Sequence, residues 1–529
     1  MGKKSKRTRN IDSKQNQSLA PASAKKDSES LISSNKKTTS QKSKSPSTLQ
    51  ESFENLQFED PFEDEYEEEV LAEEGDEYKD GKEEENGDVK VKSWTPFSKK
   101  YQLSENETLE MDESAYTMHH ALTPEWPSLS FSILRDSLGD SRTRFPHSMI
   151  CAVGTQADKV EKNRLTLIKL SDLSKTNMKN KDDDEMEKAY DEEDDENEES
   201  DDDEDLNPTL EHISIKHNGG VNRVRAMPQM PNIVATWSDI GNVYMYNVES
   251  ALDTFQRSAG LPTKSKSSIN SHKSPFFTYQ GHSTEGYAMD WSPVTAGQFA
   301  TGDCNGSIHL WSPDQIGKGS YSTSSFEIVK DAYKYSAKES VEDIQWSPTE
   351  STVLASAHCH GELKIFDTRR TKQSMLTHST TAGGVDLNVI AWNHNVSNLL
   401  ATGADDGVFS VWDLRTFSSN SSKVEPLARF TCHNTPITSL QWHPTDESMI
   451  LVSDDNGAYV YDLSIETDDV DEAKNAIGND DEDEEIPPQL LFVHAGQNLV
   501  KECHWHPQIP SLIMSTAQTG FSVFVPSNL

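Results

Sequence analysis

The residues best suited to chemistry in this 529-residue chain lie in two short runs that mix histidine with cysteine. One run is His358–His360 ("HCH") and the other is Cys503–His506 ("CHWH"). Imidazole nitrogens and thiolates are ligands that zinc prefers, and a cysteine beside a histidine can also act as a nucleophile with its base. Either run could hold a metal or begin covalent catalysis, unless the fold already uses these residues.

The fold does use them, because both runs fall on the landmarks of an internal repeat. Five segments place a tryptophan fifteen residues before a turn glycine, and a sixth keeps this spacing with Ala226 in place of tryptophan. The five pairs are Trp291 and Gly306, Trp346 and Gly361, Trp392 and Gly407, Trp442 and Gly457, and Trp505 and Gly520. We therefore interpret these histidines, aspartates and tryptophans as structural. No P-loop, acid–base pair or metal-ligand spacing occurs outside the landmarks, so the sequence predicts no enzyme, no cofactor and no metal site.

Each repeat has the pattern of short strands joined by tight turns. An apolar run is followed by an Asp-Gly or Asn-Gly type of turn and then by an alternating strand such as Val408–Asp413. Six repeats of this kind, 46 to 65 residues apart, together with strands of a first blade in Ile150–Leu170, predict an all-β, seven-bladed propeller. To close the ring, we expect Trp126–Leu134 to pair with the last blade. Residues 112–122 are predicted to form a short helix that is capped by Asp112.

The formal net charge of −40 is concentrated in three acidic segments. Residues 59–88 carry a net −15, residues 182–205 carry −17 and residues 466–485 carry −10, so the rest of the chain is nearly neutral. Such segments cannot bury enough apolar surface to fold, and we expect them to be disordered. The predicted domains are a disordered basic Ser/Thr-rich tail (1–58), a disordered acidic segment (59–100), a helix region (101–125), and the propeller (126–529) with acidic inserts at 182–205 and 466–485.

The basic tail suggests where the protein acts. It begins with the cluster "KKSKR", which resembles a nuclear import signal made by Lys3, Lys4, Lys6 and Arg7. The five cysteines form no CxxC pair, which is typical of a reducing intracellular compartment. No apolar stretch approaches the ~18 residues that would indicate a membrane span. We therefore expect a nuclear and nucleolar protein that can shuttle to the cytoplasm and does not bind membranes.

The repeat resembles the WD-repeat family. Trp412-Asp413 matches its signature fully, and Gly281-His282 matches the opening of a repeat, with His217, His433 and His494 in similar places. Within that family, Thr117–Phe131 and Asp481–Gly496 are similar to the histone-binding, retinoblastoma-associated WD-repeat proteins, in which an N-terminal helix and an acidic Pro-Pro loop form a groove for a basic helix of the partner. The resemblance implies a groove made here by the 112–122 helix, by Pro487 and Pro488, and by the loop acids Asp480, Asp481, Glu482, Asp483, Glu484 and Glu485.

The long acidic segments resemble one branch of this family, the glutamate-rich WD-repeat proteins of ribosome biogenesis. That branch implies a dedicated chaperone of the basic large-subunit ribosomal protein called L-three, which it delivers to pre-ribosomal particles. The insert acids that would bind this client are Asp182, Asp183, Asp184, Glu192, Glu193, Asp201, Asp202 and Asp203. Exposed acids can steer a basic partner, whereas a net −40 repels phosphate, so direct nucleic-acid binding is not expected.

Charge alone leaves alternatives open. A histone chaperone or a subunit of a chromatin complex would use the same groove and the same chemistry. A generic scaffold could carry acidic runs only for solubility. In each case we expect the protein to be a monomer.

Overall fold

The computed structural model describes residues 97, 111–176, 208–258, 274–313, 326–335, 339–370, 372–417, 424–465 and 486–529. These residues belong to one compact unit, Val89–Leu529. The basic tail (1–58), the acidic segment 59–88 and both acidic inserts lie outside the described residues. Their predicted disorder and the predicted domain boundaries therefore stay predictions.

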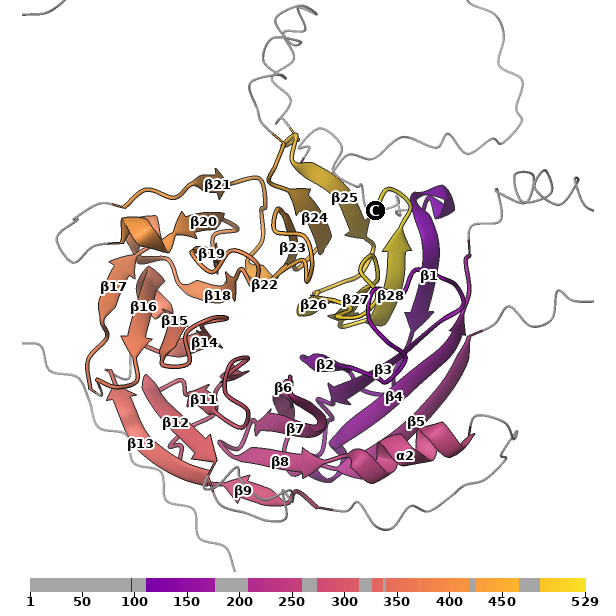
Figure 1. The fold of residues 1–529 in the computed structure, drawn as a ribbon, viewed down its shortest axis with the longest axis horizontal. Coiled ribbons are helices and arrows are strands. Elements are labelled where there is room, and N and C mark those ends of the chain that lie inside the picture. Colours follow the sequence, from indigo (N-terminus) through magenta and orange to yellow (C-terminus); the bar gives the residue numbers. More distant parts are fainter. Residues whose placement is uncertain are drawn as a thin grey trace, which may run out of the picture. The chain divides into compact units, whose positions relative to one another are not determined.

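Seven four-stranded antiparallel sheets surround a central axis as the blades of a propeller, which confirms the predicted fold (Figure 1). Each blade begins with an innermost strand near the axis and ends with an outermost strand at the rim. The strands of blades 1 to 3 are β2 (Phe131–Leu134), β3 (His147–Gly154), β4 (Arg164–Leu173) and β5 (Thr209–Lys216); β6 (Val221–Met227), β7 (Met230–Ser238), β8 (Val243–Asn247) and β9 (Phe277–Tyr279); β10 (Ala288–Trp291), β11 (Phe299–Gly302), β12 (Ser307–Pro313) and β13 (Phe326–Lys334).

The remaining blades follow the same order, except that the last one takes its outermost strand from the beginning of the described chain. Blades 4 to 7 contain β14 (Val341–Trp346), β15 (Val353–His358), β16 (Glu362–Asp367) and β17 (Leu376–Ser379); β18 (Leu387–Trp392), β19 (Leu399–Ala404), β20 (Phe409–Asp413) and β21 (Ala428–Phe430); β22 (Ile437–Trp442), β23 (Met449–Asp454), β24 (Gly457–Asp462) and β25 (Leu490–Ala495); β26 (Glu502–Trp505), β27 (Ile513–Ala517), β28 (Gly520–Pro526) and β1 (Tyr116–Leu122).

One α-helix occurs among the described residues, α2 (Glu249–Ser258), between β8 and β9. It buries Ala251 and Phe255 in a cluster shared by blades 1 and 2.

The hydrophobic core lies in the seams between neighbouring blades. Each landmark tryptophan ends an innermost strand and is buried. The indole Nε1–H of Trp291 donates to the backbone oxygen of Arg225 at 3.1 Å, and that of Trp442 donates to the backbone oxygen of Ala391 at 3.0 Å. In both cases the acceptor belongs to the preceding blade, so these two indoles join one blade to the next, whereas that of Trp392 donates to Ser397 within its own blade.

A strand from the N-terminal side of the propeller closes the ring, as predicted, but it is not the predicted strand. Strand β1 (Tyr116–Leu122), not Trp126–Leu134, pairs antiparallel with β28, from Tyr116 opposite Pro526 to Leu122 opposite Phe521. The Trp126–Leu134 segment contributes β2, which pairs with β3 inside blade 1. Its alternating serines face the next blade instead of a sheet edge: Ser130 Oγ accepts from the backbone N–H of Val224 at 2.9 Å.

The helix predicted over 112–122 is also wrong. Asp112 does cap a helical turn, since its side chain accepts from the backbone N–H of Ser114, but this 3-10 turn ends at Ala115. The chain then continues as β1. Met118 fits both a helical and an alternating pattern, and the open edge of β28 favours the strand because pairing there buries Met118 between blades 7 and 1.

We predict that Gly407→Ala will destabilise the propeller more than Gly383→Ala. Both glycines have left-handed backbones, with φ of +79° and +78°, so both substitutions carry the same strain. A Cβ at Gly407 would also overlap the backbone oxygen of His433, whereas Gly383 has no neighbour within 4 Å. We expect a loss of about 1 kcal/mol at Gly383 and clearly more at Gly407, measured by chemical denaturation. Equal losses would contradict the steric account.

Candidate partner-binding edge

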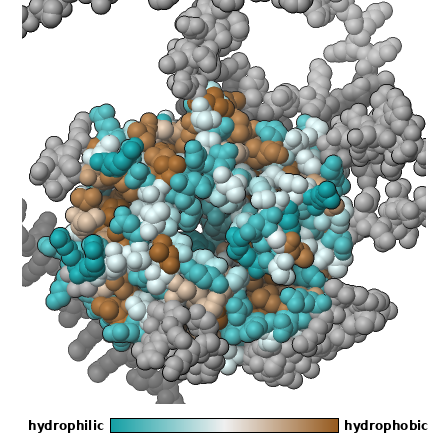
Figure 2. Space-filling view, viewed as in Figure 1, coloured by the Kyte–Doolittle hydropathy of each residue, from teal (hydrophilic) through white to brown (hydrophobic). Residues whose placement is uncertain are grey.

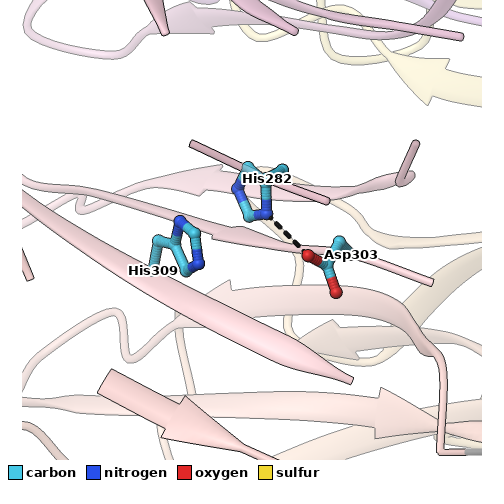
Figure 3. A group of neighbouring side chains, drawn as sticks. All are labelled: His282, Asp303 and His309. Carbon is cyan, nitrogen blue, oxygen red and sulfur yellow. Dashed lines mark hydrogen bonds and ion pairs between the residues drawn. The ribbon is translucent and has the colours of Figure 1, made fainter. Parts of the chain in front are cut away.

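Among the described residues, one group could hold a metal ion by distance alone, His282, Asp303 and His309 (Figure 3). His282 uses both ring nitrogens within blade 3: Nδ1 contacts Asp303 Oδ2 at 2.9 Å and Nε2 contacts Thr301 Oγ1 at 2.8 Å. The same Thr301 oxygen accepts from the indole N–H of Trp311 at 3.0 Å. Because this chain of hydrogen bonds engages both nitrogens of His282, it explains the group without a metal.

His309 supports this interpretation. Its ring stacks on that of His282, with centroids 3.9 Å apart, and its Nδ1 lies 2.7 Å from the hydroxyl of Tyr279. Burial lowers the pKa of His309 to about 4, so the imidazole is neutral at physiological pH. The group is therefore a hydrogen-bonded support for the turn before β12.

The two His/Cys runs are likewise parts of the fold. His358 lies 2.6 Å through Nε2 from Ser356 Oγ, and the Cys359 thiol donates to Glu342 at 3.3 Å. Burial, followed by the nearby carboxylate of Glu342, raises the pKa of Cys359 to about 12. Burial also raises the pKa of Cys503 above its usual range. Both thiols stay protonated at neutral pH, which makes them poor nucleophiles and poor metal ligands.

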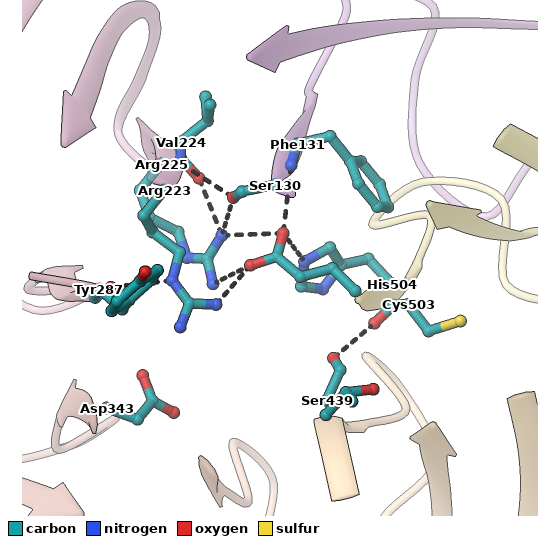
Figure 4. A network of polar contacts seen from close by, with 12 residues as sticks. Ser130, Phe131, Arg223, Val224, Arg225, Tyr287, Asp343, Ser439, Cys503 and His504 are labelled. Carbon is teal, nitrogen blue, oxygen red and sulfur yellow. Dashed lines mark hydrogen bonds and ion pairs between the residues drawn. The ribbon is translucent and has the colours of Figure 1, made fainter. Parts of the chain in front are cut away.

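The central channel contains a network of charged side chains that joins blades 7, 1 and 2 (Figure 4). Glu502 on β26 is buried and pairs with Arg223 and with Arg225, the latter at 3.1 Å. Its second carboxylate oxygen accepts from the backbone N–H of Phe131 on β2 at 3.1 Å. The two guanidinium groups hold the pKa of Glu502 well below its usual range despite its burial. One carboxylate thus ties the closing blade to the first two.

Acids play a similar part in other seams. Asp290 Oδ2 accepts from the backbone N–H of Trp346 at 2.8 Å, and Asp343 Oδ2 accepts from that of Ile390 at 3.1 Å. In each case an innermost strand caps a backbone group of the next blade. Without the close cation pair that Glu502 has, burial raises the pKa of Asp290 to about 7.

These environments predict opposite effects for two isosteric substitutions. A carboxyl with a raised pKa makes the free energy of unfolding fall as pH rises from about 4 to 7. Asp290→Asn removes this loss, so the stability of the variant relative to the parent should be greater at pH 8 than at pH 5. A carboxyl with a lowered pKa stabilises above its unfolded pKa, so Glu502→Gln should lose about 3 kcal/mol at neutral pH by leaving two partly buried cations without their carboxylate. Urea denaturation across pH 5–8 measures both. A loss of stability from both substitutions at pH 8 would contradict the assignment.

The predicted partner groove corresponds to the rim of blades 6 and 7, where β25 and β1 are the outermost strands (Figure 1). Tyr116, at the beginning of β1, places its hydroxyl 2.8 Å from Nδ1 of His494 on β25. Its ring also meets Phe492 edge-on at 5.3 Å and Phe524 of β28 at 6.0 Å. These aromatic contacts fasten the two outermost strands to each other.

The residues after β28 complete this rim. The backbone N–H of Ser527 donates to the oxygen of Ala115 at 2.9 Å, and the Asn528 amide donates to the oxygen of Leu491 at 2.8 Å. The segment 527–529 therefore bridges the beginning of β1 and the beginning of β25. We call the surface formed by Met111–Thr117, Ile486–Leu491 and Ser527–Leu529 the blade 6–7 edge.

Two of the predicted site residues lie on this edge. Pro487 and Pro488 are half-buried, and the backbone oxygen of Pro487 accepts from Leu490 at 2.9 Å in the turn that begins β25. The predicted groove helix is replaced by a strand, and the role of the two prolines in partner binding stays a prediction. Asp480–Glu485, the acids of 182–205, and Lys3, Lys4, Lys6 and Arg7 lie outside the described residues.

The blade 6–7 edge also exposes apolar side chains. Met111 is 45% exposed and Ile486 is 42% exposed. Figure 2 shows hydrophobic residues gathered at the surface over the beginning of β25. Sequence reasoning missed Tyr116 and Phe492, because aromatic residues in short strands give no sign of which strand they will meet. His494 was visible only as a repeat landmark.

The fold defines a WD-repeat propeller. Residues 106–174 match a family model that describes the histone-binding protein RBBP4 and the corresponding component of the CAF1 complex. Residues 315–525 match a model described as "MIOS, WD40 repeat". Within the described residues, no helix has the length and apolar character that crossing a bilayer requires.

Similarity to individual proteins narrows the family. The chain is 39% identical over 479 residues to "Ribosome assembly protein rrb1" of Schizosaccharomyces pombe, a match that covers 88% of this chain and 92% of that protein. It is 41% identical over 427 residues to "Glutamate-rich WD repeat-containing protein 1" of Dictyostelium discoideum, covering 80% of this chain and 83% of that protein. A more distant relative is "Histone acetyltransferase type B subunit 2" of Candida glabrata, 25% identical over 60% of this chain and 66% of that protein. The chain belongs to the family of glutamate-rich WD-repeat proteins that includes rrb1.

Proposed function

We propose that this protein is a ribosome biogenesis factor that binds a newly made basic protein of the large ribosomal subunit, the one called L-three, and delivers it to pre-ribosomal particles in the nucleolus. The observation that carries the proposal is the distribution of charge. Taken together, the three acidic segments carry a more negative net charge than the whole chain. The remaining residues, which include the propeller, are therefore nearly neutral. Ribosomal proteins are basic, and before assembly they lack the phosphates that neutralise them.

Two physical roles divide the work of binding. The acidic inserts act as a substitute for phosphate: they raise the rate of encounter, and their attraction reaches only about 8 Å at physiological salt. Packed contacts on the propeller supply specificity and slow dissociation. We assign the first role to the acids of 182–205 and the second to Asp480–Glu485 together with Pro487 and Pro488, which lie beside exposed Ile486. Binding and shielding require no catalytic group, so the proposed protein is not an enzyme.

The names of the relatives support a role in ribosome biogenesis, and they do not name the client. The fission yeast relative is named for ribosome assembly, which favours a ribosomal client. The match of residues 106–174 to a histone-binding family favours a second candidate, a histone chaperone or a subunit of a chromatin complex. Both clients are basic proteins that function on nucleic acid, and the inventory of proteins that copurify in low and in high salt distinguishes them.

We predict that replacing the acids of 182–205 by Asn, Gln and Ser will reduce protection of the ribosomal client. The propeller should stay folded, since the buried clusters between the described blades are formed by other residues, while the client should bind more slowly and aggregate sooner at physiological salt. Light scattering of the client and stopped-flow association measure the two effects. Raising the salt should reduce the difference between variant and parent, because screened charges contribute less.

A matched control keeps the charge of residues 182–205 and changes only the order of the residues. A variant with the sequence of 182–205 shuffled retains the net −17 and should protect the client as the parent does. If the neutralised variant protects the client equally well, the acidic runs serve only solubility and the proposed mechanism fails.

We also predict that changing Lys3, Lys4, Lys6 and Arg7 to serine will slow nuclear accumulation of a fluorescent fusion. This cluster is the densest group of basic residues in the chain, and importers recognise such clusters by charge. The control changes Lys25, Lys26, Lys36 and Lys37 instead, which removes the same charge from the same tail. Equal effects of the two variants would show that the tail acts through its charge and not through this signal.

A further inference from the structure

Phe97 comes from outside the seven blades and lies on the seam between blades 5 and 6. Its ring stacks on that of Tyr459 of β24, with centroids 5.4 Å apart, and it meets the imidazole of His433 edge-on at 5.2 Å. Phe97 is half-buried and packs against the hydrophobic cluster that these two blades share. We call the rings of His433 and Tyr459 the blade 5–6 aromatic surface.

Hydrogen bonds within the propeller fix this surface. His433 Nδ1 lies 3.0 Å from Asp454 Oδ2, and its Nε2 lies 3.0 Å from the hydroxyl of Tyr461. Tyr459 then packs edge-on against the imidazole, with ring centroids 4.6 Å apart. Because both nitrogens of His433 are engaged by the fold, the two rings form a preorganised contact for an aromatic side chain, and Phe97 is not needed to hold them in place.

Phe97 itself is held less firmly than the surface on which it lies. Its backbone is left-handed, with φ of +67°, a conformation that costs free energy for a residue with a bulky side chain. The comparable ring in blade 7 is Tyr116, which contacts His494, is 5% exposed and belongs to the paired strand β1. Phe97 is attached to the propeller through a half-buried ring, and we infer that another aromatic ring can replace it.

The sequence around Phe97 has the composition of a basic partner. Residues 90–100 ("KVKSWTPFSKK") contain four lysines and no acid, in a chain whose net charge is −40. They also follow closely on the acidic segment 59–88. An aromatic residue with basic neighbours in sequence therefore lies on the propeller of a protein whose proposed client is basic.

We propose that the blade 5–6 aromatic surface is a docking site for an aromatic side chain in a basic segment of a partner protein, and that Phe97 occupies this site in cis until such a segment displaces it. The proposal deepens the proposed function, and it rests on that function for the basic character of the partner. A competitor in the same chain acts at a high effective concentration. It therefore excludes basic proteins that bind weakly, and it yields to a partner that makes further contacts.

The test uses the full-length protein and a fluorescein-labelled peptide with the sequence of residues 90–100, with binding followed by fluorescence anisotropy. Phe97→Ala in the protein removes the competitor, and we expect it to tighten binding of the peptide about tenfold. A peptide that itself carries Phe97→Ala should gain nothing. Raising the salt should weaken both peptides but leave the difference between them, because an aromatic contact is not screened.

Phe145→Ala is the matched control. Phe145 is another half-buried phenylalanine whose ring contacts a histidine, His147, at 4.3 Å, but it lies in blade 1. Its substitution should leave the affinity for the peptide unchanged. Equal affinity of the parent and the Phe97→Ala protein would overturn the proposal, and so would a loss of thermal stability in Phe97→Ala without a gain in affinity, because Phe97 would then be only a structural contact.

A photocrosslinking peptide locates the site. With benzoylphenylalanine in place of the peptide's phenylalanine, we expect mass spectrometry to find crosslinks to the segments that contain His433 and Tyr459, and fewer of them in the parent than in the Phe97→Ala protein. Crosslinks that map to other blades would contradict the proposed site.

The proposed function fails on a different readout. If the parent protein does not keep the ribosomal client soluble, the client assignment is wrong whatever the peptide shows. If the parent protects the client but the Phe97→Ala protein binds the peptide no better, the docking inference alone is wrong.

Discussion

The pairing of β1 with β28 is the constraint on which the rest of the structure depends. Without it, blade 7 would consist of three strands with an exposed edge. The buried clusters between blades that contain Met118 and Tyr116 would also lose the side chains of β1. A propeller has no separate core that could hold an open ring together, because its apolar contacts lie between successive blades. Closing the last blade with a strand from the beginning of the described chain makes the stability of every blade depend on a contact of long sequence separation.

The axis of the ring meets a second requirement, which is the hydrogen bonding of the innermost strands. Their edges point into the channel and would leave backbone N–H groups unpaired. Asp290, Asp343 and Glu502 each accept one such group from the next blade. Burying carboxylates for this purpose costs free energy, and Glu502 recovers much of it by pairing with Arg223 and Arg225. These carboxylates near the axis of the ring therefore have a structural role.

The division between a closed ring and charged segments suits the handling of basic proteins. A rigid ring presents fixed apolar and aromatic contacts, whereas charges on attached segments can follow a partner whose shape they do not match closely. On the blade 6–7 edge, Met111 and Ile486 are exposed, and Ile486 directly follows the acidic insert 466–485 in the sequence.

The sequence by itself determined the repeat, the number of blades and the acidity, because a tryptophan fifteen residues from a turn glycine and a run of like charges are local patterns. It could not determine which strand closes the ring: Trp126–Leu134 alternates well, but pairing joins residues some 400 apart, and Met118 fits either period. Nor could it reveal that Glu502 meets two arginines, or that Thr176 accepts a hydrogen bond from the backbone of β1. Only the closed tertiary structure decided these points, since each contact joins elements that are far apart in the sequence.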